Sequence, residues 1–177
     1  KKTVMSLENF KNGYEVSKKS KIAQDEKNDC VVRALANAFE ISYNMSHKFV
    51  ELVMERKPKK GTQMFDTHMR AIANSGGIEF EREGQLNLFE GDVKTVKVHF
   101  VGTSPKLGGV LYNPKYTWTN KCAYTVKEFA QKFNKGTFIL TVKKHALTIK
   151  NGIIIDNGDM KFNGYRRPVL HAYKVEC

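Results

Sequence analysis

The chain has 177 residues, of which 41% are hydrophobic, and this content is ample for the core of one globular domain. No apolar run approaches the roughly 20 residues that a membrane-spanning helix requires, and no hydrophobic stretch follows the N-terminal lysines as it does in a secretory signal. We therefore expect one domain over residues 1–177 without a membrane span, in which residues 1–21 form a flexible or accessory segment.

Basic residues outnumber acidic ones. Thirty Lys and Arg against 18 Asp and Glu give a formal net charge of +12, which raises the affinity for nucleic acid and acidic proteins. The basic residues are spread along the chain rather than gathered in one stripe, so nucleic acid is a candidate partner that no motif specifies. The cysteines Cys30, Cys122 and Cys177 form no C-x-x-C pair, which argues against a zinc site or disulfide framework and favours the cytoplasm.

The first half of the chain is predicted to be helical. After a polar stretch at 1–27, apolar residues recur at helical spacing over 30–40, with Asn28 and Asp29 as capping residues. A second helix over about 44–56 is capped by Ser42 or Asn44 and has the apolar face Met45, Phe49, Leu52 and Val53. A third helix is capped by Thr62, ends at Gly76-Gly77 and has the apolar residues Phe65, Met69 and Ile72.

The second half is predicted to be mainly sheet. Short apolar or alternating runs indicate strands over 78–80, 96–100, 137–142, 146–149, 153–155 and 169–175. Residues 101–123 form an irregular connection, and a capping box from Thr125 to Glu128 begins one further helix. Helices followed by an antiparallel sheet make an α+β fold.

Cys30 has the surroundings expected of a nucleophile. It begins the predicted helix 30–40, where unpaired N–H groups and the positive end of the helix dipole favour a thiolate. His145 and Asp156 lie on the predicted sheet and complete a candidate Cys–His–carboxylate site. The other histidines show no metal-ligand spacing, so we expect neither a metal nor a cofactor.

The predicted turn at Asn151-Gly152 decides whether His145 and Asp156 can meet. A two-residue turn there fixes the register of the strands on both sides. In that register His145 and Asp156 are diagonal neighbours on the same face, within reach of a hydrogen bond, whereas Asn157 points away. A slip of one residue would exchange the two, so the choice between Asp156 and Asn157 stays open.

Each of these side chains has a chemical role. Cys30 would attack a carbonyl carbon, His145 would accept the thiol proton and later protonate the leaving group, and Asp156 would orient the imidazole. The oxyanion would be bound by the backbone N–H of Cys30 and by a side-chain amide. Gln24 is the first candidate for that amide and Asn28 is the second.

This set of residues resembles that of the papain-like cysteine peptidases, in which a Gln, a Cys at the start of the central helix, a His and an Asn or Asp follow in this order. Gln24-x5-Cys30 matches the spacing in that superfamily, and the Asp before the Cys is similar to the bacteriocin-leader peptidases. The segments 28–36 and 136–156 also resemble small papain-like proteins of tailed bacteriophages. The resemblance implies a papain-like domain, with N-terminal helices packed on a C-terminal antiparallel sheet, that acts as a thiol protease in the host cytoplasm.

Two classes of function are compatible with the sequence. The first is a cysteine hydrolase that cleaves a peptide, isopeptide or side-chain amide bond of a protein or peptide substrate through a thioester. The second is a basic, catalytically silent papain-like phage protein that binds host nucleic acid or an acidic host protein. Only the first has a use for an activated thiol.

Overall fold

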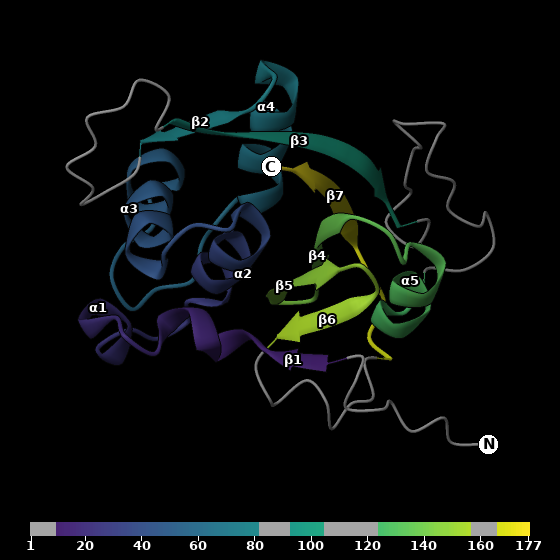
Figure 1. Ribbon diagram of the computed structural model, residues 1–177, viewed down its shortest axis with the longest axis horizontal. Coiled ribbons are helices and arrows are strands. Elements are labelled where there is room, and N and C mark those ends of the chain that lie inside the picture. The colour runs from purple at the N-terminus through teal and green to yellow at the C-terminus, as the bar shows by residue number, and fades with distance from the viewer. Residues whose placement is uncertain (1–9, 82–92, 105–123, 157–165) are drawn as a thin grey trace.

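The computed structural model describes residues 10–81, 93–104, 124–156 and 166–177 (Figure 1). Most of the predicted connection 101–123, Cys122 and Asn157 lie outside the described residues. The elements are β1 (Phe10–Asn12), η2 (Gly13–Ser17), α1 (Lys21–Gln24), α2 (Cys30–Phe39), α3 (Tyr43–Met54), α4 (Phe65–Ser75), β2 (Ile78–Glu81), β3 (Val93–Thr103), α5 (Val126–Lys132), β4 (Thr137–Val142), β5 (His145–Lys150), β6 (Ile153–Asp156) and β7 (His171–Glu176).

The strands form one sheet of seven strands in the order β1-β6-β5-β4-β7-β3-β2. The α+β class is confirmed, but the sheet is mixed rather than antiparallel, because β1 pairs in parallel with β6. Without β1, the N–H and C=O groups along one side of β6 would lack partners, and an unpaired edge of this kind is a liability. Part of the predicted accessory segment 1–21 therefore belongs to the sheet, with Asn12 opposite Asp156.

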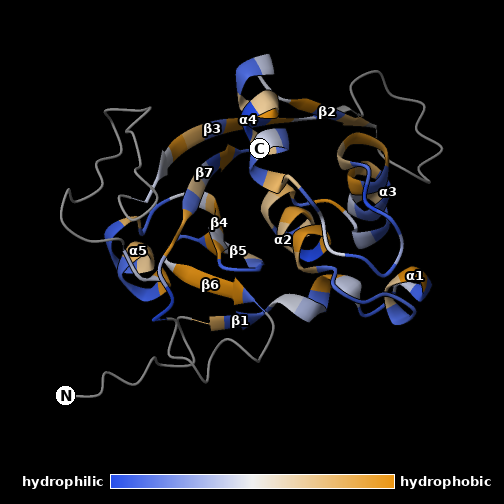
Figure 2. Ribbon diagram, turned by 180° about the vertical axis from the view of Figure 1, so that it is seen from behind, coloured by the Kyte–Doolittle hydropathy of each residue, from blue (hydrophilic) through white to orange (hydrophobic). Residues whose placement is uncertain are grey.

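Helices cover both faces of the sheet (Figures 1 and 2). Helices α2, α3 and α4 share one hydrophobic core with residues of β3, β4, β5 and β7, whereas α5 packs into a second core on the opposite face. Residues of β5 alternate between the two cores: Ala146 packs with α2, and Leu147 and Ile149 pack with α5. Figure 2 shows the apolar residues concentrated on the strands and on the sides of α2 and α3 that face the interior.

Two helices begin where their capping residues predict, whereas the residues that a helix buries do not always match the apolar spacing in the sequence. Ser42 caps α3 by accepting a hydrogen bond from the Met45 N–H, and both hydrogen bonds of the capping box at Thr125 are present. The predicted apolar face of α3 is half confirmed: Met45 and Phe49 pack, partly buried, against the core, whereas Leu52 and Val53 are exposed. The helix instead buries Tyr43, Ser46, Val50 and Met54, a second set at helical spacing. The predicted cap at Thr62 is also wrong, since α4 begins after Met64.

The hairpin between β5 and β6 has the predicted register. Lys150 pairs with Ile153, and Thr148 pairs with Ile155. Asn151 and Gly152 both have positive φ angles, of 50° and 78°, as a two-residue hairpin turn requires. This register positions the candidate site residues at the far end of the hairpin.

Replacing Gly152 with alanine tests how strongly the turn depends on glycine. A Cβ atom there would lie 3.3 Å from the carbonyl oxygen of Ala130, on a backbone with φ of +78°. We expect Gly152→Ala to lower the free energy of unfolding by about 1–2 kcal/mol, measured by urea denaturation. The control is Gly61→Ala, where no atom lies within 4 Å of the added Cβ. Equal effects of the two substitutions would contradict this reading of the turn.

Candidate active site

Cys30 is the first residue of α2 and is partly buried. Asp29 occupies the N-cap position, as predicted, but its side chain makes no capping hydrogen bond. The first backbone hydrogen bond of the helix runs from the Arg33 N–H to the Asp29 carbonyl. The backbone N–H groups of Cys30 and Val31 are therefore left without a capping side chain, at the positive end of the helix dipole.

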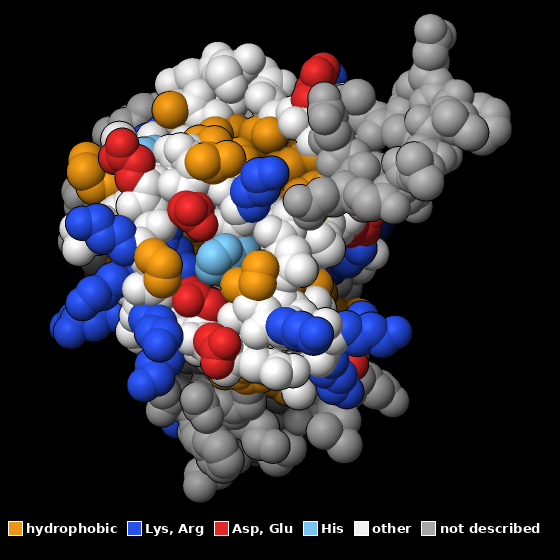
Figure 3. Space-filling model, turned by 90° about the vertical axis from the view of Figure 1, so that its left-hand side faces the viewer, with side chains coloured by type: hydrophobic (Ala, Val, Ile, Leu, Met, Phe, Trp, Pro, Cys, Tyr) orange, Lys and Arg blue, Asp and Glu red, His pale blue; other side chains and the backbone are white. Residues whose placement is uncertain are grey.

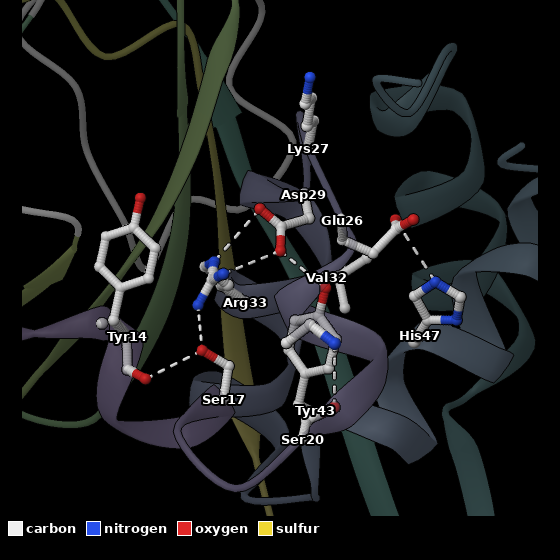
Figure 4. Close-up of polar contacts among 12 residues, drawn as sticks. Tyr14, Ser17, Ser20, Glu26, Lys27, Asp29, Val32, Arg33, Tyr43 and His47 are labelled. Atoms are coloured by element: carbon white, nitrogen blue, oxygen red, sulfur yellow. Dashed lines mark hydrogen bonds and ion pairs between the residues drawn. The ribbon is translucent and has the colours of Figure 1, made fainter. Parts of the chain in front are cut away.

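The Asp29 carboxylate is instead part of a buried network (Figure 4). Arg33 contacts both of its oxygens, at 3.2 Å and 3.0 Å, and the Tyr43 hydroxyl donates to Oδ2 at 2.7 Å. The Arg33 guanidinium also donates to the Ser17 hydroxyl and lies 4.0 Å from the centre of the Tyr14 ring. Burial and the neighbouring Asp29 charge raise the pKa of Tyr43. These contacts hold the start of α2 against η2 and α3.

A second cluster anchors the segment that precedes the nucleophile. Glu26 is buried and lies 2.5 Å from the Arg56 guanidinium, which also donates to the backbone carbonyl of Lys27. His47 on α3 is 3.4 Å from the same carboxylate, a contact shown in Figure 4. Because these contacts involve buried charges, removing one partner is costly. Residues 26–30 are thus fixed from both sides.

His145 and Asp156 meet as the hairpin register predicts. The distance from Nε2 of His145 to Oδ1 of Asp156 is 2.7 Å, and the two side chains are only 13% and 4% exposed. Because an ionised carboxylate only accepts hydrogen bonds, Nε2 carries the proton. The other ring nitrogen, Nδ1, then has a lone pair that can accept a proton.

Cys30 lies beside His145, because both residues line the same two cavities, and Asp156 lines one of these cavities with them. Burial alone lowers the pKa of His145, but hydrogen bonds with Asp156 and Cys30 and the charges of both groups raise it from 6.5 to about 9. A protonated imidazole beside the sulfur stabilises a thiolate. The arrangement is that of a nucleophile, a proton carrier and an orienting carboxylate.

A cleft of about 540 Å³ lies next to Cys30. One wall is formed by residues from 61 to 67, and the other by residues from 141 to 146, which include His145. Cys30 and Val31 also line the cleft. Cys30, His145 and the first turn of α2 therefore line one opening.

The two predicted amide donors lie elsewhere. Gln24 is exposed at the end of α1, whose buried residue is Ala23. Gln24 lines neither of the two cavities that Cys30 lines. Asn28 is also exposed, has φ of 53°, and donates its side-chain amide to the backbone carbonyl of Lys59 at 3.1 Å. The structure thus brings Cys30 together with His145 and Asp156 but brings neither amide to them.

The contacts that hold Cys30 in place were not predicted from the sequence. The spacing of four residues between Asp29 and Arg33 was a readable sign of an ion pair on a helix. No local pattern marked the Tyr43 hydroxyl or the cleft wall at 61–67, because both depend on how separate elements pack.

Comparisons with protein-family models, with curated proteins and with solved structures found no match to this chain. Within the described ranges, no three His, Cys, Asp or Glu side chains gather as metal ligands would. No described helix has the length and apolar character needed to cross a membrane.

The raised pKa of His145 depends on Asp156. In Asp156→Asn the pKa of His145 should fall well below 9, because burial then acts without the opposing carboxylate charge. The pKa is measured by following the imidazole signals in NMR spectra as a function of pH. Asp66→Asn, which removes a carboxylate beside His171 instead, is the matched control. An unchanged pKa in Asp156→Asn would show that the carboxylate does not hold the imidazole.

Proposed function

We propose that this chain is a papain-like cysteine hydrolase that cleaves an amide bond. The observation that carries the proposal is that Cys30, at the start of α2, lines the same two cavities as His145, whose Nε2 lies 2.7 Å from Oδ1 of Asp156. An α+β domain that joins a helix-borne cysteine to a histidine and an acid on a sheet is also the arrangement that the resemblance implies.

In the first half of the reaction, the sulfur of Cys30 attacks the carbonyl carbon of the amide. The Cys30 proton has passed to His145, which carries it while Asp156 stabilises the imidazolium. When the tetrahedral intermediate collapses, the C–N bond breaks and His145 gives the proton to the leaving nitrogen. The products of this half are an amine and a thioester on Cys30.

In the second half, water releases the acyl group. His145, now neutral, accepts a proton from a water molecule that attacks the thioester carbonyl. The C–S bond breaks, a carboxylic acid leaves, and the proton returns to the Cys30–His145 pair. The protein is thereby regenerated without any other reactant.

The oxyanion of both tetrahedral intermediates needs hydrogen-bond donors. The N–H groups of Cys30 and Val31 are suited to this role, because Asp29 does not cap them and both residues line the cleft. The oxyanion hole of this proposal is thus built from backbone, without Gln24 or Asn28.

The proposal predicts turnover that depends on the thiol. Incubated with a library of proteome-derived peptides, the wild-type chain should produce new termini detectable by mass spectrometry. Cys30→Ser should abolish this cleavage without loss of the fold, and His145→Ala should slow it by about 10²–10⁴-fold. Equal cleavage by the wild type and Cys30→Ser would refute the assignment.

The net charge of +12 supports a second proposal, that the chain binds nucleic acid or an acidic protein. Figure 3 shows the face over α1 and α3, where basic side chains are interspersed with acidic and apolar ones rather than arranged in one stripe. The charge therefore favours this function less specifically than the three-residue site favours hydrolysis.

A further inference from the structure

We propose that the cleft beside Cys30 binds a lysine or arginine side chain of the substrate through the carboxylate of Asp66. This inference rests on the proposed function, because it names the substrate class of the same site. Asp66 lies in the first turn of α4 and lines the cleft together with Cys30 and His145. Its side chain is 32% exposed, so a ligand can reach it.

The Asp66 carboxylate is held in place by β7. The Tyr173 hydroxyl donates to Oδ1 at 2.5 Å, and Nε2 of His171 lies 3.3 Å from Oδ2. Tyr173 is fully buried between the sheet and the helices, so its hydroxyl is a fixed support. A carboxylate has about four acceptor positions, and these two contacts leave capacity for a further donor. A fixed carboxylate loses little side-chain entropy when it binds a cation.

The negative charge of Asp66 is not cancelled by these partners. Burial lowers the pKa of His171, an effect that the Asp66 charge opposes and Arg70 reinforces, and a lowered pKa favours the neutral imidazole. Burial and Asp66 raise the pKa of the Tyr173 hydroxyl, which favours its protonated, neutral form. Arg70 offsets part of the charge, but it donates to Thr103 and lies 4.6 Å from the centre of the Phe100 ring.

The rest of the cleft suits a long side chain with a cationic end. Met64 is 69% exposed and provides an apolar surface for the methylene groups of lysine or arginine, and the buried residues Phe65 and Val142 also line the cleft. Lys144 is the basic residue of the cleft lining. Lys144 is exposed, so water and salt screen its charge.

The test uses peptidyl acyloxymethyl ketones, which alkylate an activated cysteine after their side chains bind. Probes with lysine, Nε-acetyl-lysine, norleucine or glutamate, placed one or two residues from the ketone, are compared by the rate of Cys30 labelling in intact mass spectra. Each rate is divided by the iodoacetamide rate of the same variant. For the wild type, the lysine probe should label Cys30 about tenfold faster than the norleucine or acetyl-lysine probe.

Asp66→Asn should reduce that preference to about twofold or less, because the charge of the acceptor is lost. Asp25→Asn makes the same chemical change at an exposed residue outside the cleft and should keep the full preference. The acetyl-lysine probe removes the charge from the ligand instead, so the test holds even where Asp66→Asn does not fold.

The outcomes separate this inference from the proposed function. If iodoacetamide labels Cys30 rapidly but the lysine and norleucine probes react equally, the cationic site is wrong and the hydrolase assignment stands. Faster labelling by the glutamate probe would overturn the site in favour of one built on Lys144. If Cys30 reacts with none of the reagents, the proposed function fails, and this inference fails with it.

Discussion

The candidate site depends on the register of the hairpin between β5 and β6. Only in the observed register do His145 and Asp156 lie within 2.7 Å, and a slip of one residue would turn one of them to the opposite face. Asn151 and Gly152 set this register with positive φ angles. Strand β1 and the residue after it also hold the register, because Asn12 pairs with Asp156 and Gly13 lies close to the Asp156 backbone.

The start of α2 departs from ordinary helix capping. An aspartate at the N-cap usually stabilises a helix by accepting a hydrogen bond from its first turn. Here Asp29 binds Arg33 and Tyr43 instead, and this buried network fixes the position of the helix. Cys30 and Val31, whose N–H groups Asp29 leaves uncapped, line the cleft, and the proposed hydrolase would use these groups to bind the oxyanion. Local departures of this kind are expected at functional sites.

Features encoded by neighbouring residues were predictable from the sequence. The cap at Ser42, the capping box at Thr125 and the hairpin at Asn151 each involve groups a few residues apart, and all three are confirmed. The contact of His145 with Asp156 followed from the same hairpin.

Features that depend on the packing of distant segments were not predictable. On α3 the residues that pack against the core include Val50 as well as Met45 and Phe49, whereas Leu52 and Val53 of the predicted face are exposed. The pairing of β1 with β6 joins residues more than 140 positions apart, and no local pattern marks it. The alternation of side chains along β5 and β6 predicts that His145 and Asp156 share a face of the sheet. It does not predict that the start of β5 lies beside Cys30. For the same reason the amide of Gln24 was a plausible donor by spacing and is exposed in the fold.

The most direct measurement is the rate at which iodoacetamide alkylates each cysteine as a function of pH, read by peptide mass spectrometry. Burial raises the pKa of Cys177, which makes that residue an internal reference for an unactivated thiol. If His145 activates the nucleophile, Cys30 should react at pH ~6 at least about tenfold faster than Cys177, since an ordinary thiol is then almost fully protonated. His145→Ala should remove most of that advantage. If Cys30 reacts as slowly as Cys177 at this pH, and is indifferent to the loss of His145, the three side chains are not a catalytic site.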